Sequence, residues 1–150
     1  MTSKQIISLL PYQEPFLFVD AITAVSENNI TGQYLFRENA FFYAGHFKNN
    51  PVTPGVILTE CMAQIGLVSL GIYLAHCKKE TVTNTNVALT GSQIDFFLPV
   101  MPKELVTVYS EKIYFRFNKL KCRVSLKNAK NELVCRGVIS GMIKSSQNET

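Results

Sequence analysis

The distribution of apolar and polar positions along the chain predicts one long, fully buried helix. From Gly55 to about Cys77 nearly every residue is apolar, with no polar face left for water. A helix that is apolar all round must be buried all round. In a chain of 150 residues, we expect a sheet to wrap around this helix and cover it.

The remaining segments supply that sheet. Residues 3–9 predict a short helix that ends at Pro11, and residues 40–54 are irregular and rich in Gly, Pro and Asn. Alternating, β-branched and aromatic positions predict strands at 16–25, 30–37, 87–97, 105–117, 121–128 and 132–143, with polar turns at 26–29 and 127–131. The class is α+β, with a curled antiparallel sheet wrapped around one long central helix, which is the hotdog fold. We expect one domain over residues 1–144 and a frayed tail over 145–150.

Composition and charge narrow the possible partners. Hydrophobic residues make up 47% and charged residues 17% of the chain, which is typical of a globular protein and not of a disordered one. The net charge of +4 is spread along the sequence, so it fits an acidic partner better than nucleic acid. One basic run, Arg116, Lys119, Lys121 and Arg123, crosses a predicted strand turn; it is either a solvated hairpin or a contact for an acidic carrier protein.

The cysteines and the apolar segments indicate a cytoplasmic protein without a membrane span. Cys61, Cys77, Cys122 and Cys135 form neither a C-x-x-C pair nor a zinc-ligand cluster. We therefore expect reduced, mostly buried thiols and no metal site. The first twenty residues lack the form of a signal peptide. Polar residues interrupt the long apolar helix, so we expect it to be a core helix and not a transmembrane one.

The segment from residue 45 to residue 64 carries the candidate chemistry. His46 lies in a Gly/Pro-rich loop and can take and return a proton near neutral pH. Glu60 has mostly apolar neighbours, so its carboxylate must be paired with another group, be protonated or take part in the chemistry of the site. Gly55 begins the helix, where free N–H groups can hold a polarised carbonyl oxygen. A base, an acid and an oxyanion donor are what is needed to remove a proton beside a thioester carbonyl and expel a β-hydroxyl.

These residues resemble the FabZ-type 3-hydroxyacyl-acyl-carrier-protein dehydratases, a hotdog-fold family. The family pattern G-H-F-P-G-x-P-V-M-P-G-V-L-x-x-E-A-x-A-Q is matched in register by Gly45, His46, Phe47, Pro51, Val52, Pro54, Gly55, Val56, Glu60, Ala63 and Gln64. The separation of His46 and Glu60, 14 residues (60 − 46), is that of the family. Residues 10–20 resemble its L-P-H-R-x-P-F-L-L-V-D segment, and residues 96–102 its F-R-R-P-V-x-P segment.

The resemblance implies a role for each matched residue. His46 is the general base for the α-proton, and Glu60 is the acid that assists loss of the β-hydroxyl. The Gly55 N–H polarises the thioester carbonyl, Gln64 positions the carboxylate, and Phe47 belongs to the substrate-binding group. The resemblance further implies no cofactor, a phosphopantetheine-linked substrate on an acyl carrier protein, and a homodimer whose sites combine residues of both subunits. Related proteins also assemble as trimers of dimers.

Several positions depart from the family pattern. This sequence has Lys48-Asn49 where the family has Pro-Gly, Thr53 where it has Met, and Tyr12 where it has His. It also has Phe97-Leu98 in place of the family's Arg-Arg, and Lys103-Glu104 in place of its Gly-Asp. None removes a candidate catalytic group, and Asn49 can adopt the turn conformation that Gly favours. The apolar pair at 97–98 changes the charge near the expected tunnel mouth or carrier-docking surface.

Three functions remain open at this point. The first is dehydration of 3-hydroxyacyl thioesters to trans-2-enoyl thioesters, in fatty acid synthesis or a related polyene or polyketide-like pathway. Glu at position 60, where FabA-type relatives carry Asp, favours dehydration without isomerisation. The second is an acyl thioesterase of the same fold, and the third is a non-catalytic subunit of a heterodimer. Cys61 adjoins Glu60 but points about 100° away around the helix, so we expect it to pack and not to act as a nucleophile.

Overall fold

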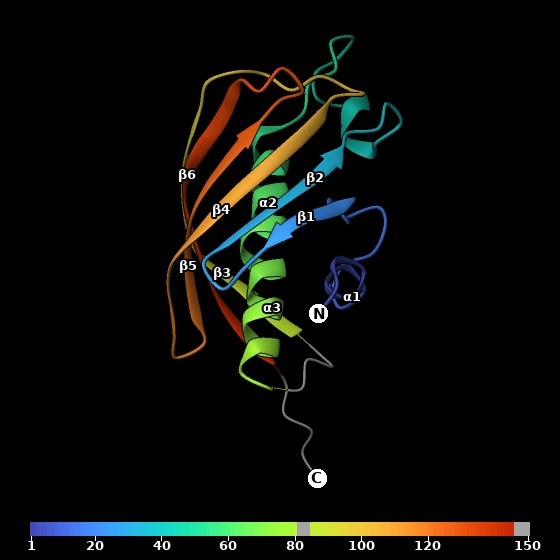
Figure 1. Cartoon of the computed structure of the whole chain (residues 1–150). Helices are drawn as coiled ribbons and strands as arrows, with labels where there is room; N and C mark the ends of the chain where they lie inside the picture. Colours follow the sequence, from blue (N-terminus) through green and yellow to red (C-terminus); the bar gives the residue numbers. More distant parts are fainter. Residues whose placement is uncertain (81–84, 146–150) are drawn as a thin grey trace.

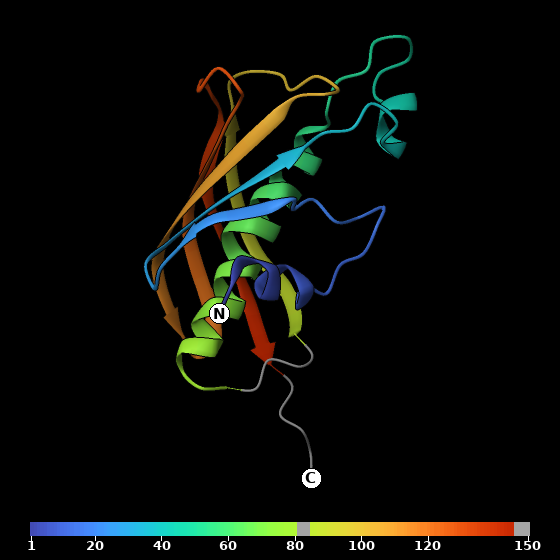
Figure 2. The same cartoon turned by 45° about the vertical axis from the view of Figure 1, so that its right-hand side comes forward.

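The computed structural model, which describes residues 1–80 and 85–145, shows a curled sheet wrapped around one central helix (Figures 1 and 2). The strands are β1 (Ala21–Val25), β2 (Asn29–Leu35), β3 (Thr85–Phe96), β4 (Leu105–Arg116), β5 (Lys119–Lys127) and β6 (Leu133–Ser145). They form a six-stranded sheet in the order β1-β2-β4-β5-β6-β3, and every neighbouring pair is antiparallel. The predicted hotdog fold is confirmed.

The central helix is continuous from Gly55 to Cys77 but is not α-helical throughout. It consists of α2 (Gly55–Ala63), a π-helical turn η2 (Gln64–Ser69) and α3 (Leu70–Cys77). Within the π turn the Ser69 hydroxyl donates to the Gln64 carbonyl at 2.7 Å, and the Ser110 hydroxyl of β4 donates to the Gly66 carbonyl at 2.8 Å. These side-chain bonds occupy carbonyls of a widened turn, which explains the departure from the single α-helix that the pattern predicts.

The burial of this helix accounts for its apolar character. It is long and apolar enough to cross a membrane by length and composition, yet 72% of its most apolar window is buried inside the fold. At Gly66 the helix meets the sheet so closely that an added Cβ would lie 3.0 Å from the Ser110 Cβ. The helix is therefore the core of the domain, as predicted.

The N-terminal part of the chain differs from the prediction in one respect. Helix α1 (Ser3–Ser8) forms as expected, with a capping box at Thr2. The hairpin also forms, but β1 begins at Ala21 and not at Phe16. Residues 16–18 bond to the central helix and not to a strand, because a buried glutamine amide takes their backbone groups.

The C-terminal strands follow the prediction within two residues at each end, and β6 reaches Ser145. Ser145 was expected to be the first residue of a frayed tail and instead ends β6, while residues 146–150 of that predicted tail lie outside the described part of the chain. The loop between β2 and α2 holds one turn of 3-10 helix, η1 (Phe41–Ala44).

Strand β3 is the last strand of the sheet, and most of its residues from Ala88 to Phe96 are exposed. It pairs with β6 on one side, and no described strand pairs with its other side. Large apolar side chains stay exposed here, including Leu89 at 51% and Phe96 at 48%. A long, apolar, unpaired edge is a surface on which another chain can add.

Candidate active site

His46 is held by the loop that follows η1, and its hydrogen bonds define its tautomer. Its Nδ1 lies 2.9 Å from the Val52 carbonyl oxygen. A carbonyl only accepts, so Nδ1 carries the hydrogen and donates. In the neutral imidazole Nε2 then holds the free lone pair, which is the arrangement a general base requires.

The loop beyond His46 closes as a tight turn. The N–H of Phe47 donates to the Asn50 carbonyl and the N–H of Asn50 donates to the Phe47 carbonyl, both at 2.9 Å. Asn49 has φ of 58°, so the expectation that it replaces the family glycine in a left-handed conformation is confirmed. The peptide bond between His46 and Phe47 is cis, and the two rings stack with centroids 4.0 Å apart.

Thr53 joins this loop to the body of the domain. It is 4% exposed, its hydroxyl lies 2.6 Å from the Tyr43 hydroxyl, and its N–H donates to the Val100 carbonyl at 2.8 Å. The methionine of the family pattern cannot make the hydroxyl contact. Thr53 and Tyr43 therefore fix the chain immediately before the central helix.

The start of α2 presents free backbone donors. The N–H groups of Ile57 and Leu58 both donate to the Pro54 carbonyl. Within the described residues, those of Gly55 and Val56 have no acceptor, as expected at a helix N-terminus. A Cβ on Gly55 would lie 3.2 Å from the Phe96 ring, so the absence of a side chain lets this ring cover the helix start.

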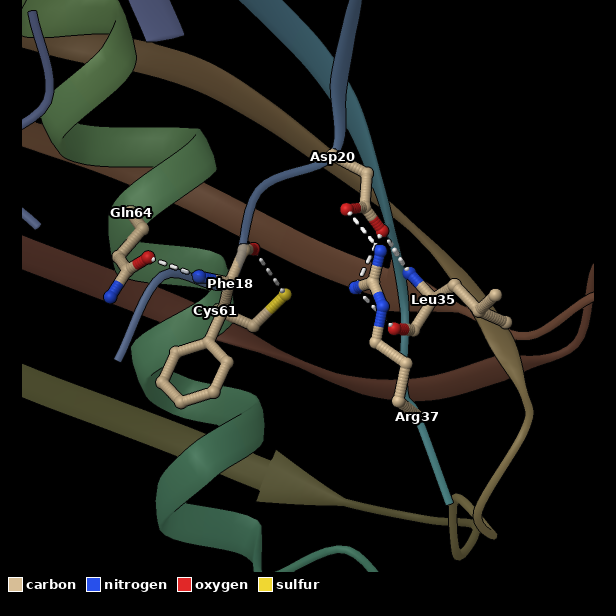
Figure 3. A network of polar contacts seen from close by, with 6 residues as sticks. All are labelled: Phe18, Asp20, Leu35, Arg37, Cys61 and Gln64. Carbon is tan, nitrogen blue, oxygen red and sulfur yellow. Dashed lines mark hydrogen bonds and ion pairs between the residues drawn. The ribbon is translucent and has the colours of Figure 1, made fainter. Parts of the chain in front are cut away.

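Glu60 is half-buried one turn further along α2, and Gln64 holds its carboxylate. The Gln64 Nε2 donates to the Glu60 Oε1 at 3.0 Å and to the Phe16 carbonyl at 3.0 Å. The Gln64 Oε1 accepts from the Phe18 N–H at 2.7 Å. This fully buried amide thus connects the carboxylate to the segment before β1, and Figure 3 shows its contact with the Phe18 N–H.

The same segment is fixed on its other side by an ion pair. The Asp20 carboxylate accepts from Arg37 at 2.8 Å and from the Leu35 N–H at 2.7 Å, and Figure 3 shows this pair beside the Phe18 contacts. The Cys61 thiol donates to the Phe18 carbonyl at 3.5 Å. Burial raises the pKa of Cys61 well above its usual range, so the thiol stays protonated and packs, as predicted.

Tyr12 is a neighbour of the candidate carboxylate that the sequence did not single out as functional. Burial raises its pKa above the ordinary range for tyrosine, and the negative charge of Glu60 adds to the shift. Its hydroxyl therefore stays protonated next to the site. The only signal in the sequence is its place in the Leu-Pro-Tyr segment, where the family pattern has histidine.

The candidate residues fall into two groups that do not meet within one protomer. His46 and Phe47 lie on the loop, while Gly55, Glu60 and Gln64 lie on the central helix. No hydrogen bond or ion pair among the described residues joins His46 to Glu60. Phe47, next to His46 on the loop, is 56% exposed, and Val56, at the start of the helix, is 76% exposed, so both groups carry an exposed apolar side chain.

The described residues offer no metal site and no disulfide. Within residues 1–80 and 85–145, no three His, Cys, Asp or Glu side chains gather closely enough to hold a metal ion. All four cysteines are free, with Cys77 exposed and the other three buried.

Comparison with known proteins places this arrangement in a family. Residues 10–139 match the family model of the FabA-like domain. The chain is 30% identical over 150 residues to the 3-hydroxyacyl-[acyl-carrier-protein] dehydratase FabZ of Ehrlichia chaffeensis, covering 97% of this chain and 96% of that protein. It is also 30% identical to FabZ of Caldicellulosiruptor bescii, covering 93% and 96%.

Solved structures show the same fold at low identity. The dehydratase heterocomplex ApeI:P of Xenorhabdus doucetiae superposes with a TM-score of 0.79 at 12% identity, covering 99% of this chain and 93% of that one. A thioesterase of Haemophilus influenzae superposes with a TM-score of 0.70 at 14% identity, covering 100% and 96%. Because one fold carries both activities, these likenesses define the architecture alone.

Proposed function

Because the chain belongs to the FabA-like family, as a FabZ-type hotdog dehydratase of the hydro-lyase class, we propose that it dehydrates 3-hydroxyacyl thioesters to trans-2-enoyl thioesters. The acyl group arrives on the phosphopantetheine arm of an acyl carrier protein, in fatty acid synthesis or a related polyene or polyketide-like pathway. No organic cofactor or metal takes part. Four unbridged cysteines support a cytoplasmic location.

The observation that carries the proposal is the hydrogen bond from His46 Nδ1 to the Val52 carbonyl. It directs the lone pair of Nε2 towards the open side of the loop, where it takes the proton from C2 of the substrate. The negative charge that develops on the thioester oxygen is stabilised by the free N–H of Gly55 at the helix N-terminus. Phe47, stacked on the imidazole, limits the positions that the ring and the acyl chain adopt.

Glu60 completes the elimination. It gives a proton to the hydroxyl at C3, the C–O bond breaks, and water leaves as the C2–C3 double bond forms. The proton taken by His46 then returns to the carboxylate through solvent, which resets both groups. Gln64 acts as a positioning residue, because its amide holds Oε1 of Glu60 and leaves Oε2 for the substrate.

The catalytic pair is completed by two protomers in this proposal. Within one protomer no hydrogen bond or ion pair among the described residues joins His46 to Glu60, and the outer edge of β3 is unpaired with Leu89 and Phe96 exposed. Antiparallel pairing of β3 with β3 of a second copy joins the two sheets and covers these side chains. His46 of each protomer then faces Glu60 of its partner. Native mass spectrometry measures directly whether three such dimers assemble further.

The test is mass spectrometry of the acyl group after incubation with a 3-hydroxyacyl carrier substrate. The wild-type protein should remove one water, and neither His46→Ala nor Glu60→Ala should do so. Release of free acid would instead establish a thioesterase. An unchanged acyl group over several chain lengths would refute a self-sufficient enzyme and direct the search to an unlike partner subunit.

A further inference from the structure

The central helix widens at the residue that holds the candidate carboxylate. The π turn η2 begins at Gln64 and ends at Ser69, so the residue that bonds to Glu60 is also the first residue of the widened turn. A π turn closes its hydrogen bonds over five residues where an α turn closes them over four, so it holds one residue more. Single π turns inside α-helices occur frequently at functional sites.

The extra residue sets the rotation of α2 relative to α3. Helix α3 is fixed on the sheet, because Gly71 packs so closely against Ile143 of β6 that an added Cβ would overlap the Ile143 Cδ1. One residue turns an α-helix by about 100° around its axis. A regular α-helix over residues 55–77 would therefore turn Gln64 away from the segment before β1, to which its amide bonds in the structure.

Two buried hydroxyl groups hold the widened turn. The Ser69 hydroxyl donates to the Gln64 carbonyl at 2.7 Å, and the Ser110 hydroxyl of β4 donates to the Gly66 carbonyl at 2.8 Å. Serine in a regular α-helix bonds to the carbonyl three or four residues back, whereas Ser69 bonds to the carbonyl five residues back. Ser69 is fully buried and Ser110 is 4% exposed, so bulk water does not compete for these carbonyls.

Gly66 allows the sheet to reach the turn. An added Cβ at this position would lie 3.0 Å from the Ser110 Cβ, 3.1 Å from the Ser110 Oγ and 3.1 Å from the Val124 Cγ1 of β5. A side chain here would separate β4 from the helix and lengthen the bond from the Ser110 hydroxyl. The widened turn is therefore fixed by the sheet, and not by the local sequence of the helix alone.

We propose that Ser69 and Ser110 are positioning residues for Glu60. This inference rests on the proposed function, in which Glu60 gives a proton to the hydroxyl at C3 of the substrate. The two hydroxyls fix the π turn, the turn orients the Gln64 amide, and the amide holds the Glu60 Oε1 at 3.0 Å. Neither serine touches the substrate, so their loss should slow the chemical step without removing a group that binds the acyl chain.

The first test is steady-state dehydration kinetics with a 3-hydroxyacyl pantetheine substrate. Ser69→Ala/Ser110→Ala should lower kcat and kcat/KM by the same factor, about 10- to 100-fold, as expected when a catalytic group is displaced by about 1 Å. Each single variant should lose a smaller factor in the same way. Where the double variant does not fold, the two single variants give the same comparison.

A matched control separates positioning from stability. Ile143→Val removes the Cδ1 that packs against Gly71, so it loosens the contact of α3 with the sheet and leaves the π turn intact. It should lower the melting temperature, as the serine variants do, and keep the wild-type kcat. A fall in kcat that is confined to the serine variants therefore reports the position of Glu60 and not the loss of folded protein.

Hydrogen exchange tests the structural step without turnover. The Phe18 N–H donates to the Gln64 Oε1 at 2.7 Å, and Phe18 is 1% exposed, so the exchange of this proton reports whether the amide is held. It should exchange about tenfold faster in the serine variants than in Ile143→Val, because a bond to a buried group is weakened.

The outcomes distinguish this inference from the proposed function. An inactive wild-type protein would refute the proposed function and the positioning role together. An active wild-type protein whose serine variants keep the kcat of Ile143→Val would refute the positioning role alone. Exchange of the Phe18 N–H at the wild-type rate in the serine variants would also refute it, because the two hydroxyls would then not hold the Gln64 amide.

Discussion

Replacing Gln64 by leucine tests whether one buried amide holds the segment before β1 on the central helix. The side chain is fully buried and makes three hydrogen bonds, to the Phe18 N–H, the Phe16 carbonyl and Glu60. Leucine has a similar volume but can form none of them. Gln64→Leu therefore removes polar contacts with little change in packing.

The size of the stability loss depends on whether water can reach each former hydrogen-bond partner of Gln64. The Phe18 N–H is buried and loses its acceptor, which costs about 1–3 kcal/mol. Phe16 is 42% exposed and Glu60 is half-buried, so water replaces those two bonds at a cost of about 0.5–1.5 kcal/mol each. The expected loss of unfolding free energy is about 2–6 kcal/mol, which lowers the melting temperature of a chain of this size by about 4–24 °C.

Urea unfolding followed by circular dichroism measures this loss. Gln13→Leu is the matched control, because Gln13 is exposed in the same segment and its replacement should change stability by less than about 0.5 kcal/mol. If Gln64→Leu also stays within about 0.5 kcal/mol of wild type, the amide does not hold this segment and the argument from its hydrogen bonds is refuted.

Three further predictions concern the sheet and the thiols. Gly137→Ala should destabilise the protein by about 3 kcal/mol, because the new Cβ would overlap the Gln93 carbonyl; thermal unfolding measures this, and Gly45→Ala, with open space around it, is the control. Ellman's reagent should modify Cys77 alone until the protein unfolds. Burial raises the pKa of Cys122 to about 11, so its contribution to stability is complete below the unfolded pKa of about 8.5 and is lost as pH rises towards 11, by about 1.4 kcal/mol per pH unit. Urea unfolding measured at several pH values from 8 to 10.5 should show that the unfolding free energy falls less steeply with pH in Cys122→Ala than in wild type. An equally steep fall in both proteins would contradict the raised pKa of Cys122.

The elements with local signals were predictable from the sequence. The helix from Gly55 to Cys77 follows from its predominantly apolar character, and the strands follow from alternation. The π turn at Gln64–Ser69 was not predictable, because it depends on a bond from Ser110 of a distant strand. The false strand at 16–20 has a similar cause: β-forming residues there bond to an amide that lies 46 residues away from Phe18.

The candidate site was predictable where its residues lie within one turn of helix. Glu60 and Gln64 are four residues apart, so helical geometry alone places them together, and the structure shows their hydrogen bond. The nearness of Tyr12 to Glu60 depends on the path of a loop, which no periodicity encodes. The division of the site between protomers is already implied by the family resemblance of the sequence, and the unpaired edge of β3 supports the proposal.

The most direct test of the two-protomer site is complementation between inactive subunits. His46→Ala and Glu60→Ala proteins are each expected to be inactive, and they are mixed under conditions in which native mass spectrometry shows subunit exchange. Half of the resulting dimers are mixed, and each mixed dimer holds one site with both groups intact, so about a quarter of wild-type dehydratase activity should return. If exchange is complete and no activity returns, His46 and Glu60 act within one protomer, and the site is not shared between subunits.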